Sequence, residues 1–285
     1  MKRYVMVLGI LLAGLLAAGT AGAQSMPLRT PDATILKPGT LRTQVGFDFL
    51  QNIDYPLSGL SGDLTSMGVL NMRLGLARRV EVQLQGTVQN FLQVNNKVPA
   101  PVTPDLTGTN STHDVGDFSL WTKILIRKEE RRTPAVAFRF GFLMPNTNQA
   151  RGIGNNATNV YASVILQKHF GKLKAWTNTG LGILQSPNAK FSQNDELLYG
   201  GALAYPVMRR LSLVGEVEGR YSSRTLVPAL YGTESRAEGR MGLVVSAWGF
   251  QWDVAAIAGV YPNDPSTGVT VGISRDLHIF SPHKH

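Results

Sequence analysis

The most constraining feature of the chain is a long alternation of apolar and polar side chains between Val80 and Val94. Apolar residues stand at most even positions of this run and polar residues at most odd positions. A period of two places successive side chains on opposite faces of a β-strand, whereas a helix would need a period near 3.6. Strands of soluble proteins usually have about 5–6 residues. The run therefore predicts an unusually long strand with one apolar and one polar face.

The same pattern recurs along the chain and predicts about twelve strands. They lie at residues 40–50, 64–77, 80–94, 118–127, 136–142, 160–170, 173–184, 196–205, 211–221, 236–247, 251–261 and 268–280. Their connections alternate in length. The long ones are 51–63, 95–113, 145–159, 185–195 and 222–235; the short ones are 77–79, 128–133, 170–172, 206–210 and 248–250; and 262–266 is intermediate. This alternation of loop lengths is not expected of a soluble β-sandwich. It is typical of outer-membrane barrels, which have short periplasmic turns and long external loops.

Strands that turn an apolar row toward lipid must form a closed sheet, because hydrocarbon cannot hydrogen-bond an open edge. The predicted fold is therefore all-β: a closed antiparallel up-and-down transmembrane β-barrel of about 12 strands over residues 40–280. This prediction requires that the row containing Val82, Leu84 and Val88 touches lipid rather than a second sheet or a helix.

The first 23 residues are typical of a secretory signal peptide. Lys2 and Arg3 precede an apolar run, and Ala21-Gly22-Ala23 forms a small-residue cleavage site before Gln24. Residues 24–39 are interpreted as a periplasmic N-terminal segment and residues 281–285 as a C-terminal tail. Cleavage would remove two cations and no acids from the formal charge of +9, leaving +7. The remaining cations are scattered, so no nucleic-acid partner is expected.

The face opposite the apolar row carries charged side chains, which we expect to line a pore. These candidates are Arg42, Arg73, Glu81, Lys123, Arg139, Glu216, Glu218, Arg220, Arg236, Glu238 and Arg240. They are compatible with a packed lattice of ion pairs or with a weakly anion-favouring channel. The densest group is the set on residues 216–220 and 236–240, where any constriction is expected.

Candidates for catalysis and metal binding are sparse. The chain has no cysteine, which excludes thiolate chemistry and disulfides. His113, beside Asp114 and Ser111, lies at a predicted outer loop, where such residues are usually solvated. His278, His283 and His285 belong to an expected tail rather than a metal site, and residues 152–157 resemble a dinucleotide fingerprint only in sequence and are read as a flexible loop. We expect no enzyme activity, no cofactor and no metal.

Several segments resemble a bacterial outer-membrane family named for the MetA pathway of phenol degradation. They are Leu36-Lys37-Pro38-Gly39-Thr40, Leu74-Gly75-Leu76-Ala77-Arg78-Arg79-Val80-Glu81-Val82, Val115-Gly116-Asp117-Phe118 with Lys123, and Phe142-Leu143-Met144-Pro145. The chain departs from the family at Pro145-Asn146-Thr147, where Pro-Thr-Gly is usual. The resemblance implies an outer-membrane channel associated with aromatic or other small apolar compounds, and it implies no catalytic residues.

Together these features predict a monomeric barrel of the bacterial outer membrane, exported through the periplasm. Its partners would be outer-membrane lipid and a small-molecule solute taken up passively. Three alternatives remain: a closed structural or adhesive barrel that acts through its loops, a hydrolase that uses His113, and a soluble periplasmic β protein.

Overall fold

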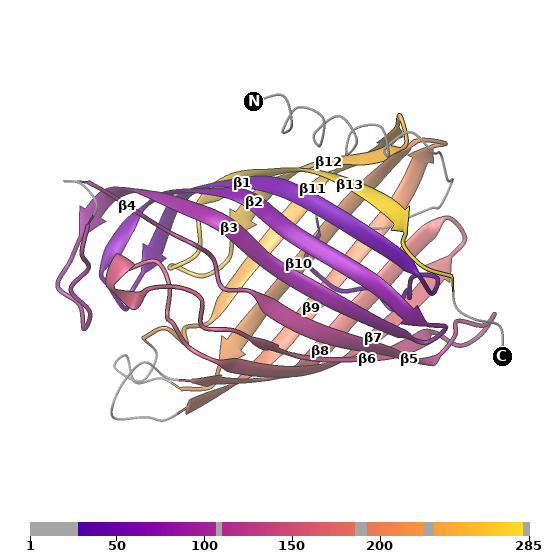
Figure 1. Ribbon diagram of the computed structural model, residues 1–285, viewed down its shortest axis with the longest axis horizontal. Coiled ribbons are helices and arrows are strands. Elements are labelled where there is room, and N and C mark those ends of the chain that lie inside the picture. Colours follow the sequence, from indigo (N-terminus) through magenta and orange to yellow (C-terminus); the bar gives the residue numbers. More distant parts are fainter. Residues whose placement is uncertain (1–27, 107–109, 186–192, 225–230, 282–285) are drawn as a thin grey trace.

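The computed structural model describes residues 28–106, 110–185, 193–224 and 231–281 as one sheet closed into a barrel (Figure 1). Its strands are β1 (Thr40–Tyr55), β2 (Leu60–Ala77), β3 (Val80–Lys97), β4 (Ser111–Asp114), β5 (Ser119–Arg127), β6 (Ala135–Leu143), β7 (Asn159–Phe170), β8 (Leu173–Gln185), β9 (Gln193–Met208), β10 (Leu211–Ser222), β11 (Arg236–Ala247), β12 (Phe250–Gly259) and β13 (Thr267–His278). A 3-10 turn, η2, spans Gln149–Arg151. Twelve long strands form the wall, as predicted, and β4 is a four-residue addition.

Antiparallel pairing closes the barrel without a free long edge. The first strand pairs with the last, from Thr40 opposite His278 to Gln51 opposite Thr267. β3 pairs with β2 along its whole length, with β5 near its start and with β4 near its end. Each long strand thus has a paired strand on both sides, which is the condition for a sheet whose outer face is apolar.

The two ends of the barrel differ in their connections. We call the end with the connections 78–79, 128–134, 171–172, 209–210 and 248–249 the turn end, and the opposite end the loop end. The longest connections, 98–110, 144–158 and 223–235, all lie at the loop end, together with 56–59, 186–192 and 260–266. Residues 51–63 were predicted as a long loop, but β1 and β2 continue to Tyr55 and from Leu60, leaving residues 56–59 as the turn. The strands extend because Leu50, Ile53 and Leu64 remain buried against the interior.

The outer face carries the expected apolar row. Val88 is 50% exposed, and Ile126 and Phe140 point outward in the same way. Apart from the single sheet, the described residues contain only the 3-10 turn, so neither a second sheet nor a helix from this part of the chain covers the row. In the described ranges, no helix has the length and apolarity to cross a membrane.

The alternation of β3 changes phase between Thr87 and Asn90. Leu92 and Val94 were expected on the lipid-facing side, but both are buried inside the barrel, whereas Phe91 is exposed. The change lies beside Gly68 of β2, which has φ +67° and produces a bulge in the β1–β2 pairing. A bulge adds one residue to one strand and re-aims the side chains that follow.

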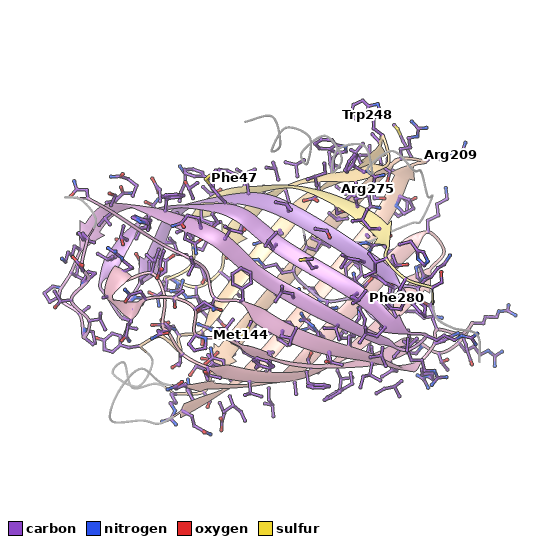
Figure 2. The ribbon with its side chains drawn as sticks, viewed as in Figure 1. Phe47, Met144, Arg209, Trp248, Arg275 and Phe280 are labelled. Atoms are coloured by element: carbon purple, nitrogen blue, oxygen red, sulfur yellow. The ribbon has the colours of Figure 1, made fainter. Side chains whose placement is uncertain are left out.

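Aromatic side chains gather on the outer surface of the turn end. Trp248 is 86% exposed, and its ring meets that of Trp252 edge-on at 6.4 Å. The Arg275 guanidinium lies 5.0 Å from the Phe250 ring centroid. Figure 2 shows Trp248, Arg209 and Arg275 at the same end of the barrel. Such a girdle marks the level of a membrane interface in transmembrane barrels.

The outward row predicts a position-dependent cost for a new charge. Leu84→Arg should lower the free energy of unfolding by about 2–4 kcal/mol, because the guanidinium would sit in hydrocarbon near the bilayer midplane. Val98→Arg makes the same kind of change one residue beyond the end of β3 and should have little effect. Urea unfolding in lipid vesicles measures both, and equal stabilities would contradict a lipid-facing Leu84.

Candidate functional site

The inside of the barrel is occupied by the chain's own N-terminal segment, which we define as residues 28–39. It approaches from the turn end, where the Gly39 N–H donates to the Gly75 carbonyl over 2.8 Å. Farther along, Ala33 packs with Ala137 and Ile165 of the inner wall, and Leu28 packs with Trp176. Residues 24–39 were predicted to lie in the periplasm. Residues 28–36 instead lie in the lumen of the barrel.

Wall side chains accept hydrogen bonds from the segment's backbone. The Glu216 carboxylate accepts from the N–H groups of Arg29 and Thr30, each over 2.7 Å. Gln167 accepts from the Ala33 N–H at 3.1 Å, and Glu81 accepts from the Leu36 N–H at 2.9 Å. An extended segment with no strand partner needs such acceptors, because buried N–H groups without partners are costly.

Asp32 is the electrostatic centre of the segment. Its carboxylate lies 2.7 Å from the Lys174 Nζ, 3.4 Å from Arg73 and 3.5 Å from Lys123. Burial by itself would raise the pKa of the Asp32 carboxyl, but these three cations outweigh burial and hold that pKa well below its ordinary value. Asp32 is therefore ionised at neutral pH and neutralises part of the cationic wall.

Arg29 forms a second polar contact, on the opposite wall. Its guanidinium lies 3.2 Å from Asp48 and 3.4 Å from Glu238. Arg240 lies 3.0 Å from the same Glu238 and 3.8 Å from Glu216. The densest charged group, on residues 216–220 and 236–240, thus binds the N-terminal segment.

The structure places the candidate pore-lining residues on the inward face of the strands. Those residues are Arg42, Arg73, Glu81, Lys123, Arg139, Glu216, Glu218, Arg220, Arg236, Glu238 and Arg240. Most form ion pairs with one another, with the segment or with other residues of the wall. Examples are Arg42 with Asp276 at 2.5 Å and Arg220 with Glu196 at 3.3 Å. Their arrangement is a lattice that holds the segment.

Arg29 and Asp32 were missed because the segment was assigned outside the barrel. One signal could have located them. Trp176, Ala202 and Val214 face inward, where a water-filled pore would favour polar side chains. An apolar patch on the inner wall implies that another part of the chain covers it.

A cavity of about 520 Å³ lies above the segment, toward the loop end. Leu28, Arg29 and Pro31 of the segment form part of its boundary. The wall contributes an aromatic side with Trp121 and Tyr161, and a charged side with Glu218, Arg220, Arg236 and Glu238. The size falls in the usual range for small-molecule sites, about 300–1,000 Å³.

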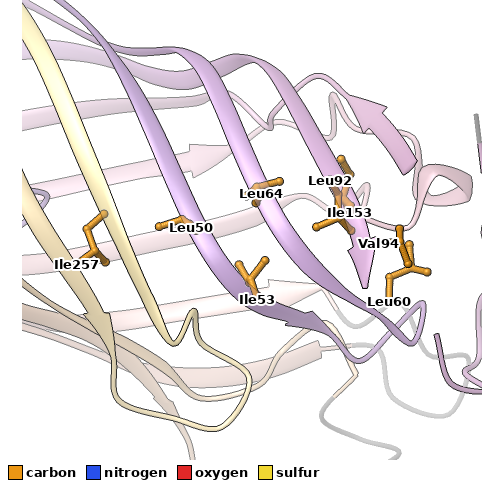
Figure 3. Close-up of a cluster of buried hydrophobic side chains, with 8 residues drawn as sticks. All are labelled: Leu50, Ile53, Leu60, Leu64, Leu92, Val94, Ile153 and Ile257. Atoms are coloured by element: carbon orange, nitrogen blue, oxygen red, sulfur yellow. The ribbon is translucent and has the colours of Figure 1, made fainter. Parts of the chain in front are cut away.

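The loop end is covered by ordered connections. Ile153, from the connection between β6 and β7, packs into a buried cluster with Leu50, Ile53, Leu60, Leu64, Leu92, Val94 and Ile257 (Figure 3). The Ala150 carbonyl accepts from the Asp105 N–H at 2.7 Å, and the Ser58 hydroxyl donates to the Gly152 carbonyl at 2.6 Å. Residues 152–157, read from sequence as a flexible loop, are thus held by packing and hydrogen bonds.

The residues around His113 lie on β4, where that short strand pairs with β3. Both carboxylate oxygens of Asp114 accept backbone N–H groups, from Val115 and Asn148. The His113 ring packs near Phe91 on the outer side, with 6.1 Å between ring centroids. The described residues hold no cluster of three or more metal-ligating side chains. His283 and His285 of the tail lie outside the described residues.

No protein-family model and no curated protein matches this chain. Among solved structures, the COG4313 outer membrane channel from Pseudomonas putida F1 is similar, with a TM-score of 0.61 and 16% identity over 88% of this chain and 100% of that one. The translocator domain of autotransporter NalP from Neisseria meningitidis has a TM-score of 0.44 and 10% identity, covering 83% of this chain and 87% of that one. The CymD monoaromatic hydrocarbon channel has a TM-score of 0.41 and 8% identity over 87% and 90% of the two chains. The similarity to the COG4313 outer membrane channel shows that the two chains share a fold.

The contacts of Asp32 predict how the N-terminal segment can be released. Asp32→Asn removes one carboxylate from the group around Arg73, Lys123 and Lys174. Removing one partner of a buried ion pair lowers the free energy of unfolding by about 3–5 kcal/mol. The segment should therefore exchange its amide hydrogens faster and be cut by trypsin after Arg29. Asp105→Asn, an exposed position in a loop, is the matched control. Unchanged exchange in Asp32→Asn would show that the ion pairs do not hold the segment.

Proposed function

We propose that this chain is a bacterial outer-membrane channel through which small solutes diffuse passively. The observation that carries the proposal is the lumenal cavity of about 520 Å³, enclosed by a closed barrel and lined by both aromatic and charged side chains. The similarity in fold to the COG4313 outer membrane channel supports it. Outer-membrane lipid would surround the apolar row and the aromatic girdle, and the barrel would act as a monomer.

The N-terminal segment sets the mechanism of this proposal. Solute would enter between the connections at the loop end, occupy the cavity and then meet residues 28–36. Those residues are held by Glu216, Glu81 and the cations around Asp32. Passage would require the segment to shift within the lumen, because it fills the turn-end half. Conductance would then depend on how tightly the segment is bound.

The solute class is the finer part of the proposal. The MetA-pathway resemblance implies aromatic or other small apolar compounds, and Trp121 and Tyr161 in the cavity wall suit a planar apolar solute. Their rings stack with centroids 5.3 Å apart and an angle of 20°. Aromatic walls of this kind bind planar ligands by stacking and burial.

A closed structural or adhesive barrel is the second candidate. The filled turn-end half and the ordered connections at the loop end favour it over an open pore. We further propose that the chain is not an enzyme, since Asp114 is engaged by backbone N–H groups. If the protein hydrolysed a lipid or peptide and His113→Ala lost that activity, the proposal that the chain is not an enzyme would be contradicted.

Conductance in planar bilayers separates the two candidates. The full mature chain should give small currents, and a variant lacking residues 24–36 should give currents several-fold larger, because the barrel strands start only at Thr40. Solute flux into liposomes should rise in parallel. Heat-modifiable migration in detergent gels would verify that the variant is folded. Absence of current and flux from both proteins would defeat the channel and leave the closed barrel.

A further inference from the structure

Arg139 is exceptional among the cations inside the barrel. Every other inward-facing cation has a carboxylate within 4 Å: Arg29, Arg42, Arg73, Lys123, Lys174, Arg220, Arg236 and Arg240. Arg139 has none among the described residues, although it is only 6% exposed. The remaining segments of the chain contain no Asp or Glu side chain. A buried guanidinium without a counter-ion is costly unless an anion reaches it.

The neighbours of Arg139 fix its position and leave donors available. Its Nε donates to Gln83 at 3.0 Å and one terminal nitrogen donates to Gln85 at 2.9 Å, both neutral amide oxygens. A guanidinium has five N–H donors. The second terminal nitrogen forms no hydrogen bond with the part of the chain that the structure describes. Arg139 lines the 520 Å³ cavity.

Arg139 also belongs to a planar stack. Its guanidinium carbon lies 3.7 Å from the Trp121 ring centroid, and Tyr161 stacks on Trp121 in turn. Gly141 makes this possible, because a Cβ there would lie 2.7 Å from the Trp121 ring. The Trp121 indole is further fixed by a 2.8 Å hydrogen bond to Ser119. The three side chains thus form a preorganised stack that carries a single positive charge.

The opposite wall limits the charge that a ligand can carry. Glu218 lines the same cavity and forms no ion pair within 4 Å with the described residues, and Glu238 is already bound to Arg29 and Arg240. The cations on that side, Arg220 and Arg236, are already paired with Glu196 and Asp264. A second anionic group directed toward that side would therefore find carboxylates and paired cations. The cavity therefore suits a ligand with one negative charge at one end.

We propose that Arg139, Trp121 and Tyr161 form a binding site for a small aromatic monocarboxylate. Its carboxylate accepts hydrogen bonds from Arg139, and its ring lies along the Trp121–Tyr161 stack. This inference specifies the solute class of the proposed channel and so rests on the proposed function. Binding of the solute can nevertheless be measured without transport.

Benzoate binding to the purified full-length barrel in detergent, followed by ligand-observed NMR, tests the site. Arg139→Gln should weaken binding about tenfold, the usual worth of a charge-assisted hydrogen bond. Arg139→Lys should restore part of the affinity. Arg127→Gln removes the same charge from an exposed position outside the cavity and should change binding by less than about twofold, because solvent screens it.

Two further probes examine the charge and the opposite wall. Benzyl alcohol, a neutral analogue, should bind about tenfold more weakly than benzoate and be insensitive to Arg139→Gln. Terephthalate, which carries a second carboxylate, should bind more weakly than benzoate. Glu218→Gln should reduce this difference in affinity. Equal benzoate binding by wild type and Arg139→Gln, or no benzoate binding at all, would overturn the site. Bilayer currents in the same preparations show separately whether the channel proposal stands.

Discussion

The structure depends on one constraint: a strand with an apolar outer face cannot leave its backbone N–H and C=O groups unpaired in hydrocarbon. Pairing of β1 with β13 meets this constraint by closing the sheet. Closure creates an interior that the strands themselves cannot fill. The side chains opposite the apolar row then face one another across a confined space, where unpaired charges are expensive. The chemistry of the lumen follows from that confinement.

Two kinds of complementarity fill the turn-end half of this space. The inner wall presents apolar patches around Trp176 and Ile165, and Leu28 and Ala33 cover them. It also presents carboxylates and ammonium groups that bind the segment's backbone and Asp32. Binding by both means keeps the segment in one position. A lumen occupied by the chain's own N-terminal segment is consistent with a regulated channel and with a closed barrel. The two candidates differ in whether the segment can move aside.

Among the described residues, every inward-facing cation except Arg139 has a carboxylate within 4 Å, which makes the departure at Arg139 informative. Its stacking on Trp121 offsets part of the cost of burial, because guanidinium groups interact favourably with aromatic faces. The neutral partners Gln83 and Gln85 orient it without neutralising it. The cavity therefore has one oriented positive charge beside two stacked aromatic rings, while the other inward-facing cations are paired with carboxylates.

Period-two patterning alone determined the strands, their number, the outward row and the inward position of charges such as Lys123 and Glu216, because those properties depend only on neighbouring residues in one strand. The inward position of Leu92 depended on a bulge at Gly68, which alternation by itself does not reveal. The extension of the first hairpin depended on the burial of Leu50, Ile53 and Leu64 against the interior. The position of the N-terminal segment was decided only by tertiary structure. Its contacts join residues far apart in sequence, such as Ala33 with Gln167 and Arg29 with Glu216, separated by 134 and 187 positions. No local pattern encodes such contacts, since they exist only once the closed wall has brought β7 and β10 around a common interior.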